Sequence, residues 1–194
     1  MPGTTLRELN GLPGAPAKLA GSTLLLIDFQ NTYTRGVLEL EGWESSLDAA
    51  ARLLARARRE GTPVVHVVHD SGAGSLYDVR AESGAIHPRL TPADGEHVVV
   101  KEAPDAFVGT DLASRIPEGQ DVVIAGWMTH MCVTFTAQGA FLRGNRPTVV
   151  AEATATRAVP ALGADVEAHH LHRGALATIA DLYGVVVATA EDLG

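Results

Sequence analysis

The chain has 194 residues, of which 46% are hydrophobic and 20% charged, proportions that are ordinary for a soluble globular domain and exclude a disordered or fibrous chain. A single domain of this length buries roughly 70% of the surface of its unfolded chain, so a sizeable core is expected. The net charge of −8 argues against a nucleic-acid partner, because the one basic cluster has the spacing of a solvent-facing helix side. That cluster is Arg52, Arg56, Arg58 and Arg59.

No apolar run approaches the ~20 residues that span a bilayer, and the first residues lack the basic and apolar regions of a signal peptide. We therefore expect a cytoplasmic protein with no membrane partner. The single cysteine, Cys132, cannot form an internal disulfide. It is either a small buried hydrophobic residue or a functional thiol.

Glycines and prolines punctuate residues 1–21, which predicts an irregular N-terminal arm ahead of one folded domain over residues 22–194. Six short aliphatic runs follow the arm. Continuous runs of this kind are typical of strands that are covered on both faces. They span residues 23–27, 63–68, 97–100, 122–125, 147–150 and 185–187.

Helical periodicity appears between these strands. In residues 43–60, Leu47, Ala50, Leu54 and Ala57 recur every three or four positions, and Gly61 stands where a helix often ends. Two further helices are predicted over residues 129–142 and 163–182. Strands that alternate with helices predict an α/β fold of three layers, α/β/α, around a mainly parallel sheet of six strands. The stretch 70–95 has few aliphatic residues, and a connection of that length is typical of a functional loop.

Three reactive side chains stand where predicted strands end. Asp28 closes the first strand, Lys101 closes the third, and Cys132 follows the fourth within VVIAGWMTHMCV. Ligands of open parallel sheets bind beyond the carboxyl ends of the strands, so these residues are candidates for one site. Each alone has an ordinary structural interpretation: a turn residue, a solvated lysine and an inert core thiol.

Together the three residues meet one chemical need, because cysteine attacks as a thiolate and a free thiol is mostly protonated at neutral pH. If Thr129 caps the helix, Cys132 lies in its first turn, where the helix dipole lowers the pKa of a thiol. The ammonium of Lys101 would lower that pKa further, and Asp28 would take the thiol proton and return it to a leaving amine. We therefore predict a nucleophile, a cation and a base.

The motifs around these residues resemble the isochorismatase-like cysteine hydrolases, which include nicotinamidases, N-carbamoylsarcosine amidases and streptothricin hydrolase. The resemblance runs from about Thr23 to Leu193 and rests on LLLIDFQNTY, VVVKEAPDAFVGTDL, VVIAGWMTHMCVTFTAQGAFLRG and VVAEATATR. It implies a Rossmann-like fold and a catalytic triad of Asp28, Lys101 and Cys132, with a covalent thioester on the cysteine. It also implies a cis peptide at Trp127–Met128 and an oxyanion hole formed by the backbone N–H groups of Met128 and Cys132.

The resemblance also bears on substrate, cofactor and assembly. The chain lacks the Asp-x-His of nicotinamidases after the second strand, where it reads HVVHDSGAGSLYD, so we expect neither a metal site nor a cofactor.

Family members that cleave the vinyl ether of isochorismate lack the cysteine, so Cys132 favours C–N cleavage in an amide, ureide or carbamoyl compound. An ether hydrolase, a metal-assisted nicotinamidase-like amidase and an inactive binding protein remain the alternatives. The family implies a homo-oligomer: a dimer, tetramer or octamer.

Several side chains near the predicted triad are candidates for contact with a small-molecule substrate, although core packing explains the aromatic ones equally well. His130 is more simply explained by a hydrogen bond to the backbone, and His169, His170 and His172 by a solvated or subunit-facing helix surface. The candidate substrate-binding residues are Phe29, Gln30, Tyr33, His69, Phe107 and Trp127.

Overall fold

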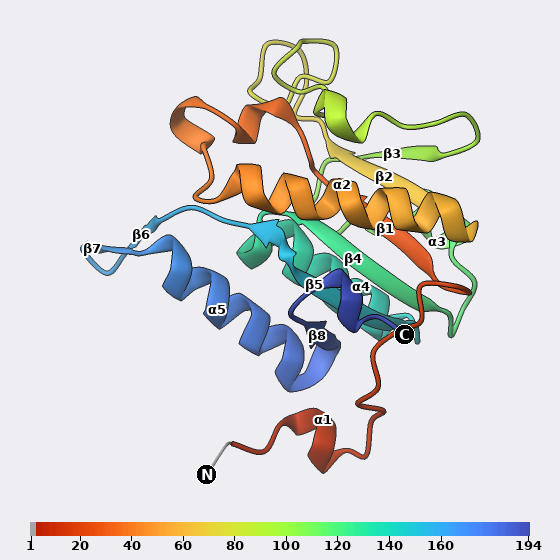
Figure 1. Ribbon diagram of the computed structural model, residues 1–194. Helices are drawn as coiled ribbons and strands as arrows, with labels where there is room; N and C mark the ends of the chain where they lie inside the picture. The colour runs from red at the N-terminus through yellow and green to blue at the C-terminus, as the bar shows by residue number, and fades with distance from the viewer. Residues whose placement is uncertain (1–2) are drawn as a thin grey trace.

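A computed structural model describes residues 3–194, and its centre is a six-stranded parallel sheet with helices on both faces (Figure 1). This confirms the predicted fold class and all six predicted strands. The strands lie side by side in the order β3 (His97–Lys101), β2 (Val64–His69), β1 (Thr23–Ile27), β4 (Asp121–Trp127), β5 (Arg146–Ala155) and β8 (Val185–Val187).

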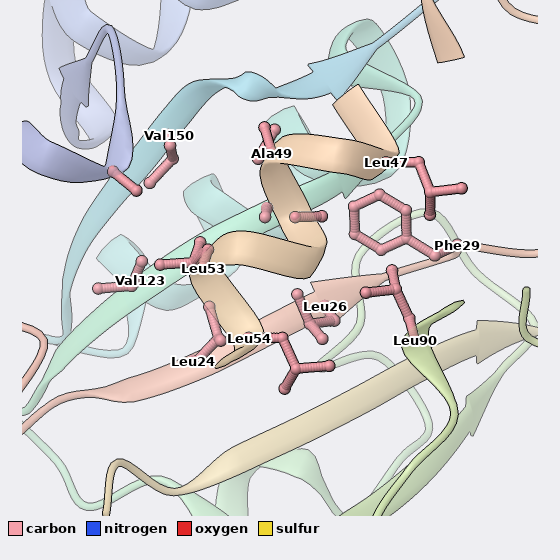
Figure 2. Close-up of a cluster of buried hydrophobic side chains, with 14 of the residues drawn as sticks. Leu24, Leu26, Phe29, Leu47, Ala49, Leu53, Leu54, Leu90, Val123 and Val150 are labelled. Carbon is pink, nitrogen blue, oxygen red and sulfur yellow. The ribbon is translucent and has the colours of Figure 1, made fainter. Parts of the chain in front are cut away.

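The central strands are buried on both faces, as their continuous aliphatic sequences predict. All five residues of β1 are buried, and alternate residues point into two separate cores. The core on one face lies between the sheet and helix α2 (Trp43–Glu60), and Figure 2 shows its side chains from β1, β4, β5 and α2. Leu24, Leu26, Val123, Val150 and Leu53 belong to this cluster.

Helix α2 is the helix that the sequence predicts over residues 43–60, and it ends at Gly61 as expected. Gly61 has a left-handed backbone, and its N–H donates to the carbonyls of Ala57 and Arg58, the usual way in which a glycine closes a helix. The outer arginines Arg52 and Arg56 pair with Glu152 and Glu60.

The opposite face is covered by shorter helices. They are α3 (Leu112–Arg115), the π-helical turn η4 (Thr129–Val133) with α4 (Thr134–Leu142), and α5 (Ala168–Thr178) with the π-helical turn η5 (Ile179–Tyr183). Short 3-10 turns complete the chain: η1 (Asn31–Tyr33), η2 (Gly36–Leu38), η3 (Pro88–Leu90) and η6 (Ala190–Asp192). None of the helices within residues 3–194 combines the length and apolar character that crossing a bilayer requires.

The helix predicted over residues 163–182 is wrong in its first turn. Residues 159–166 instead form a hairpin of β6 (Val159–Ala161) and β7 (Ala164–Val166), which projects from the body of the protein (Figure 1). Leu162 and Gly163 form the two-residue turn, both with positive φ. Because such a turn reverses the chain, helix α5 can begin only at Ala168.

The N-terminal arm is less irregular than predicted. Thr5 and Glu8 form a capping box around the one-turn helix α1 (Leu6–Leu9), in which each side chain satisfies a backbone N–H. Arg7 donates to the Leu182 carbonyl, and Leu6 N–H donates to Asp181. The arm is therefore docked on the C-terminal half of the domain.

The core under α2 should dominate stability. Leu53 is fully buried, whereas Leu142 is 71% exposed. Leu53→Ala is expected to lower the free energy of unfolding by about 2–5 kcal/mol, because it removes buried contacts and leaves a cavity. Leu142→Ala, a matched control, should change it by less than about 0.5 kcal/mol. Denaturant unfolding measures both, and equal losses would contradict this account of the core.

Candidate active site

The three reactive residues lie together at the carboxyl edge of the sheet. Asp28 follows β1, Lys101 ends β3, and Cys132 lies in η4, directly after β4. Strand β2 separates β1 from β3, so Asp28 and Lys101 approach each other across the end of an intervening strand. The sheet order explains why residues that are distant in sequence converge here.

Lys101 is the centre of the cluster. Its Nζ lies 2.8 Å from Asp28 Oδ2 and 3.3 Å from Cys132 Sγ. The side chains of Asp28 and Lys101 are fully buried, and Cys132 is 5% exposed. Cys132 is therefore the most exposed of the three residues.

Local backbone geometry places Asp28. Its φ of 53° lies in the left-handed region, which Asp tolerates better than most residues and which turns the side chain away from the strand's alternation. Gly126, on the neighbouring strand, allows the close approach: a Cβ there would lie 2.5 Å from the carbonyl oxygen of Ile27. A side chain at residue 126 would therefore push β4 away from the end of β1.

Side-chain contacts anchor the first two residues of η4, the turn that carries Cys132. The peptide between Trp127 and Met128 is cis, as the resemblance implies. Thr129 does not cap the helix, because its hydroxyl lies 3.0 Å from His172 Nδ1; Met128 occupies the cap position. His130 Nδ1 lies 2.5 Å from the Thr156 hydroxyl, so its partner is a side chain rather than a backbone carbonyl.

The protonation states differ from those that the sequence suggests. Burial raises the pKa of the Cys132 thiol, the charge of Asp28 raises it further, and Lys101 acts in the opposite direction. Burial likewise raises the pKa of Asp28, although Lys101 opposes the rise. Burial alone would lower the pKa of Lys101, but the nearby negative charges outweigh it and the net direction is upward.

At neutral pH the cluster therefore contains a neutral thiol beside an ammonium. The expected lowering of the thiol pKa is not observed: its direction is upward, because burial and the charge of Asp28 outweigh the effect of Lys101. Asp28 Oδ2 contacts Lys101 Nζ, and a side-chain hydrogen bond with Cys132 also acts to lower the pKa of Asp28. The carboxyl group of Asp28 is therefore placed to accept the thiol proton.

Of the candidate substrate contacts, four are not accessible. Phe29, Tyr33 and Trp127 pack against one another in the core on the α2 face, and the Trp127 indole N–H donates to the Ser46 hydroxyl. Gln30 is fully buried, and its amide bonds the backbone of His69 and the carbonyl of Gly84. All four residues are buried in this structure, so none of them is exposed to a molecule in solution.

The other two candidates stay partly exposed. His69 Nδ1 lies 3.3 Å from Lys101 Nζ, and its Nε2 lies 2.9 Å from the Ser71 hydroxyl. Phe107 packs against the core that contains Cys132, with the guanidinium of Arg143 over its ring, 5.3 Å from the ring centre. Within residues 3–194, no group of three or more His, Cys, Asp or Glu side chains is arranged to hold a metal ion.

Sequence reasoning missed two residues that lie near the cluster. Tyr77, from the 70–95 loop, stacks edge-on against His69 with ring centres 4.8 Å apart, and its hydroxyl lies 3.3 Å from that of Tyr33. Arg157 is close enough that, after burial, its charge lowers the pKa of His130. Arg157 closes the motif VVAEATATR, which was the available signal for it; Tyr77 had none beyond its place in a long loop.

Comparisons with known proteins agree with the observed fold. The model of the isochorismatase domain matches residues 22–192. A secreted isochorismatase effector of Verticillium dahliae is 34% identical over 97% of this chain and 98% of its own, and a maleamate amidohydrolase of Pseudomonas putida is 34% identical over 69% of this chain and 72% of its own. The solved structure of an isochorismatase from Pseudomonas putida KT2440 superposes with a TM-score of 0.93 at 33% identity, covering 100% of both chains.

The charges around Cys132 predict how its pKa responds to substitution. Asp28→Asn is expected to lower the thiol pKa, because the anion that raises it is lost while the ammonium stays. Adding Lys101→Met to that variant is expected to raise the thiol pKa again, because the cation is lost. Since Cys132 is the only cysteine, the rate of iodoacetamide labelling across about pH 5 to 11 reports its ionisation alone. Identical labelling profiles for the two variants and the wild type would contradict the assigned charges.

Proposed function

This chain belongs to the isochorismatase family of hydrolases, and from that premise we propose that it cleaves a C–N bond of a small molecule by forming a thioester on Cys132. Amides, ureides and carbamoyl compounds are the proposed substrate class. The observation that carries the proposal is the position of the Lys101 ammonium, which contacts the Asp28 carboxylate and the Cys132 sulfur at once. A base, a nucleophile and a cation in mutual contact are the groups that acyl transfer through a thiol requires.

In the acylation step, the Cys132 sulfur attacks the carbonyl carbon while its proton passes to Asp28. The raised pKa of Asp28 suits this exchange, because a carboxyl group that binds a proton readily is a better base than an ordinary aspartate. Lys101 keeps its own proton and stabilises the negative charge that develops on the sulfur as its proton leaves. The C–N bond then breaks, and the amine departs with the proton held by Asp28.

In the deacylation step, water attacks the thioester carbon and gives a proton to Asp28. The C–S bond breaks, the acid is released, and Asp28 returns the proton to the sulfur. Each cycle ends with the neutral thiol and the Asp28–Lys101 ion pair. No step consumes a cofactor.

The carbonyl oxygen becomes negative in both steps and requires hydrogen-bond donors. We assign this role to the backbone N–H groups of Met128 and Cys132. Met128 follows the cis peptide, and Cys132 lies in the helical turn η4, so both belong to a segment that is anchored through Thr129 and His130. An anchored backbone donor costs little reorganisation when the charge develops.

The proposed bond class rests on the nucleophile and on a relative. Cys132 supplies the thiol that a thioester requires, and the 34% identical protein of Pseudomonas putida is a maleamate amidohydrolase. The proposal extends to the class of bond and not to one compound.

The test uses the purified full chain and a panel of primary amides, ureides and carbamoyl amino acids, with release of ammonia or amine as the readout. Wild type is expected to hydrolyse at least one member, and Cys132→Ala should lower kcat at least about 10⁴-fold, because the covalent route is lost. Ser114→Ala, which removes one exposed heteroatom on α3, is the control and should keep full activity.

Two results would sink the proposal. One is turnover of a C–N substrate that survives in Cys132→Ala at the wild-type rate. The other is cleavage of a vinyl ether by a wild-type protein that leaves every C–N compound intact.

A further inference from the structure

His69 lies beside the three reactive residues, yet the steps above leave it without a role. It ends β2 and is the register partner of Lys101, which ends β3. The two side chains therefore leave adjacent strands at the same edge of the sheet, and His69 Nδ1 reaches to 3.3 Å from Lys101 Nζ. This contact is as short as the contact between Lys101 and the cysteine.

The contact completes the hydrogen bonding of the ammonium. A lysine ammonium has three hydrogens to donate, and that of Lys101 has three neighbours that can accept: the Asp28 carboxylate, the Cys132 sulfur and His69 Nδ1. Nδ1 accepts only while it carries no proton, so the ring hydrogen belongs on Nε2. There it has an acceptor 2.9 Å away, the hydroxyl of Ser71, and the contacts of both ring nitrogens agree on one tautomer.

His69 is itself held in place from several sides. The buried amide of Gln30 accepts from the backbone N–H of His69 and donates to its carbonyl, both at 2.9 Å. The ring packs edge-on against Tyr77. With its backbone fixed and both nitrogens occupied, the ring serves as part of the support for Lys101 rather than as a free contact for a ligand.

We propose that His69 is a positioning residue, which accepts the third hydrogen of the Lys101 ammonium and so directs the other two at Asp28 and Cys132. The inference rests on the proposed function, because it assigns His69 to the reactivity of Cys132. Without this acceptor the ammonium can rotate, and its hydrogens no longer favour the sulfur as it becomes negative.

This role depends on pH in one direction. Protonation of Nδ1 removes the acceptor and places an imidazolium next to an ammonium. Burial, and then the charge of Lys101, lower the pKa of His69, so the acceptor is present at neutral pH and is lost only in acid. The charged or titratable groups that face the ring are Asp28, Asp70, Tyr77, Lys101 and Glu102.

The experiment compares the rate of iodoacetamide labelling of Cys132 in the wild type, His69→Leu and His69→Asn, in the full chain from acid to neutral pH. Leu has no acceptor, whereas Asn offers an amide oxygen near the position of Nδ1 and does not titrate. At neutral pH His69→Leu should label about tenfold more slowly, the effect of losing about 1.4 kcal/mol in one hydrogen bond to a charged group. His69→Asn should recover most of the wild-type rate.

The pH dependence separates positioning from a general structural defect. The rates of wild type and His69→Leu should converge in acid, because the wild-type histidine is then protonated and has lost its acceptor as well. His170→Asn, on the exposed surface of α5, is the control and should follow the wild type at every pH.

Three outcomes decide between the claims. If His69→Leu labels at the wild-type rate, or slows equally at every pH without recovery in His69→Asn, the role of His69 is overturned. If wild-type Cys132 itself labels as an ordinary solvent-exposed thiol, the proposed function fails, whatever the His69 variants do. His69→Asn keeps the size and polarity of the site. If His69→Leu does not fold, the pH dependence of labelling in His69→Asn therefore tests the role of His69 instead.

Discussion

The buried ion pair between Asp28 and Lys101 is the interaction on which the rest of the site depends. Both side chains are fully buried, and the pair spans the end of β2 to join residues from β1 and β3. Two charges withdrawn from water cost several kcal/mol each, and their attraction repays this only with good geometry. A fold of this size does not need such a pair for stability, since two cores already cover the sheet. We propose that the pair is present because of its effect on Cys132.

In the proposed mechanism, the ion pair allows a neutral thiol to act as a nucleophile. A permanent thiolate would have to remain charged at a nearly buried position. Here burial and the charge of Asp28 raise the pKa of the thiol and keep it protonated. In the proposed mechanism the proton instead moves to Asp28 when the sulfur attacks, and the Lys101 ammonium stabilises the negative charge that develops on the sulfur. The surrounding contacts serve this exchange: Thr129 and His130 fix the turn that carries Cys132, and His69 occupies the remaining hydrogen of Lys101.

Much of this arrangement could be predicted from the sequence, because parallel strands bring their carboxyl ends to one edge and the reactive residues close or follow three of the predicted runs. What failed depended on burial and on neighbours, neither of which a single sequence records. The aromatic residues Phe29 and Trp127 satisfy the pattern of a pocket and of a core alike, and only packing separates them. The pKa of the thiol was expected to fall because the motif identifies the cation beside it. The desolvation that outweighs the cation cannot be read from the motif. The contact of His69 with Lys101 follows from the pairing of β2 with β3. The order of the strands along the chain does not determine which strands pair in the sheet.

The most direct test of the claim that the ion pair exists for chemistry is the free energy of unfolding of Lys101→Met and of the double variant Asp28→Asn/Lys101→Met, measured with denaturant. The single variant leaves an unpaired buried carboxylate and should lose about 3–5 kcal/mol, whereas the double variant removes both charges and should be as stable as the wild type or more so, as replaced buried ion pairs often are. The double variant should nevertheless lose hydrolysis. A double variant that is as unstable as the single one would contradict the account, because the pair would then be a structural element of the fold.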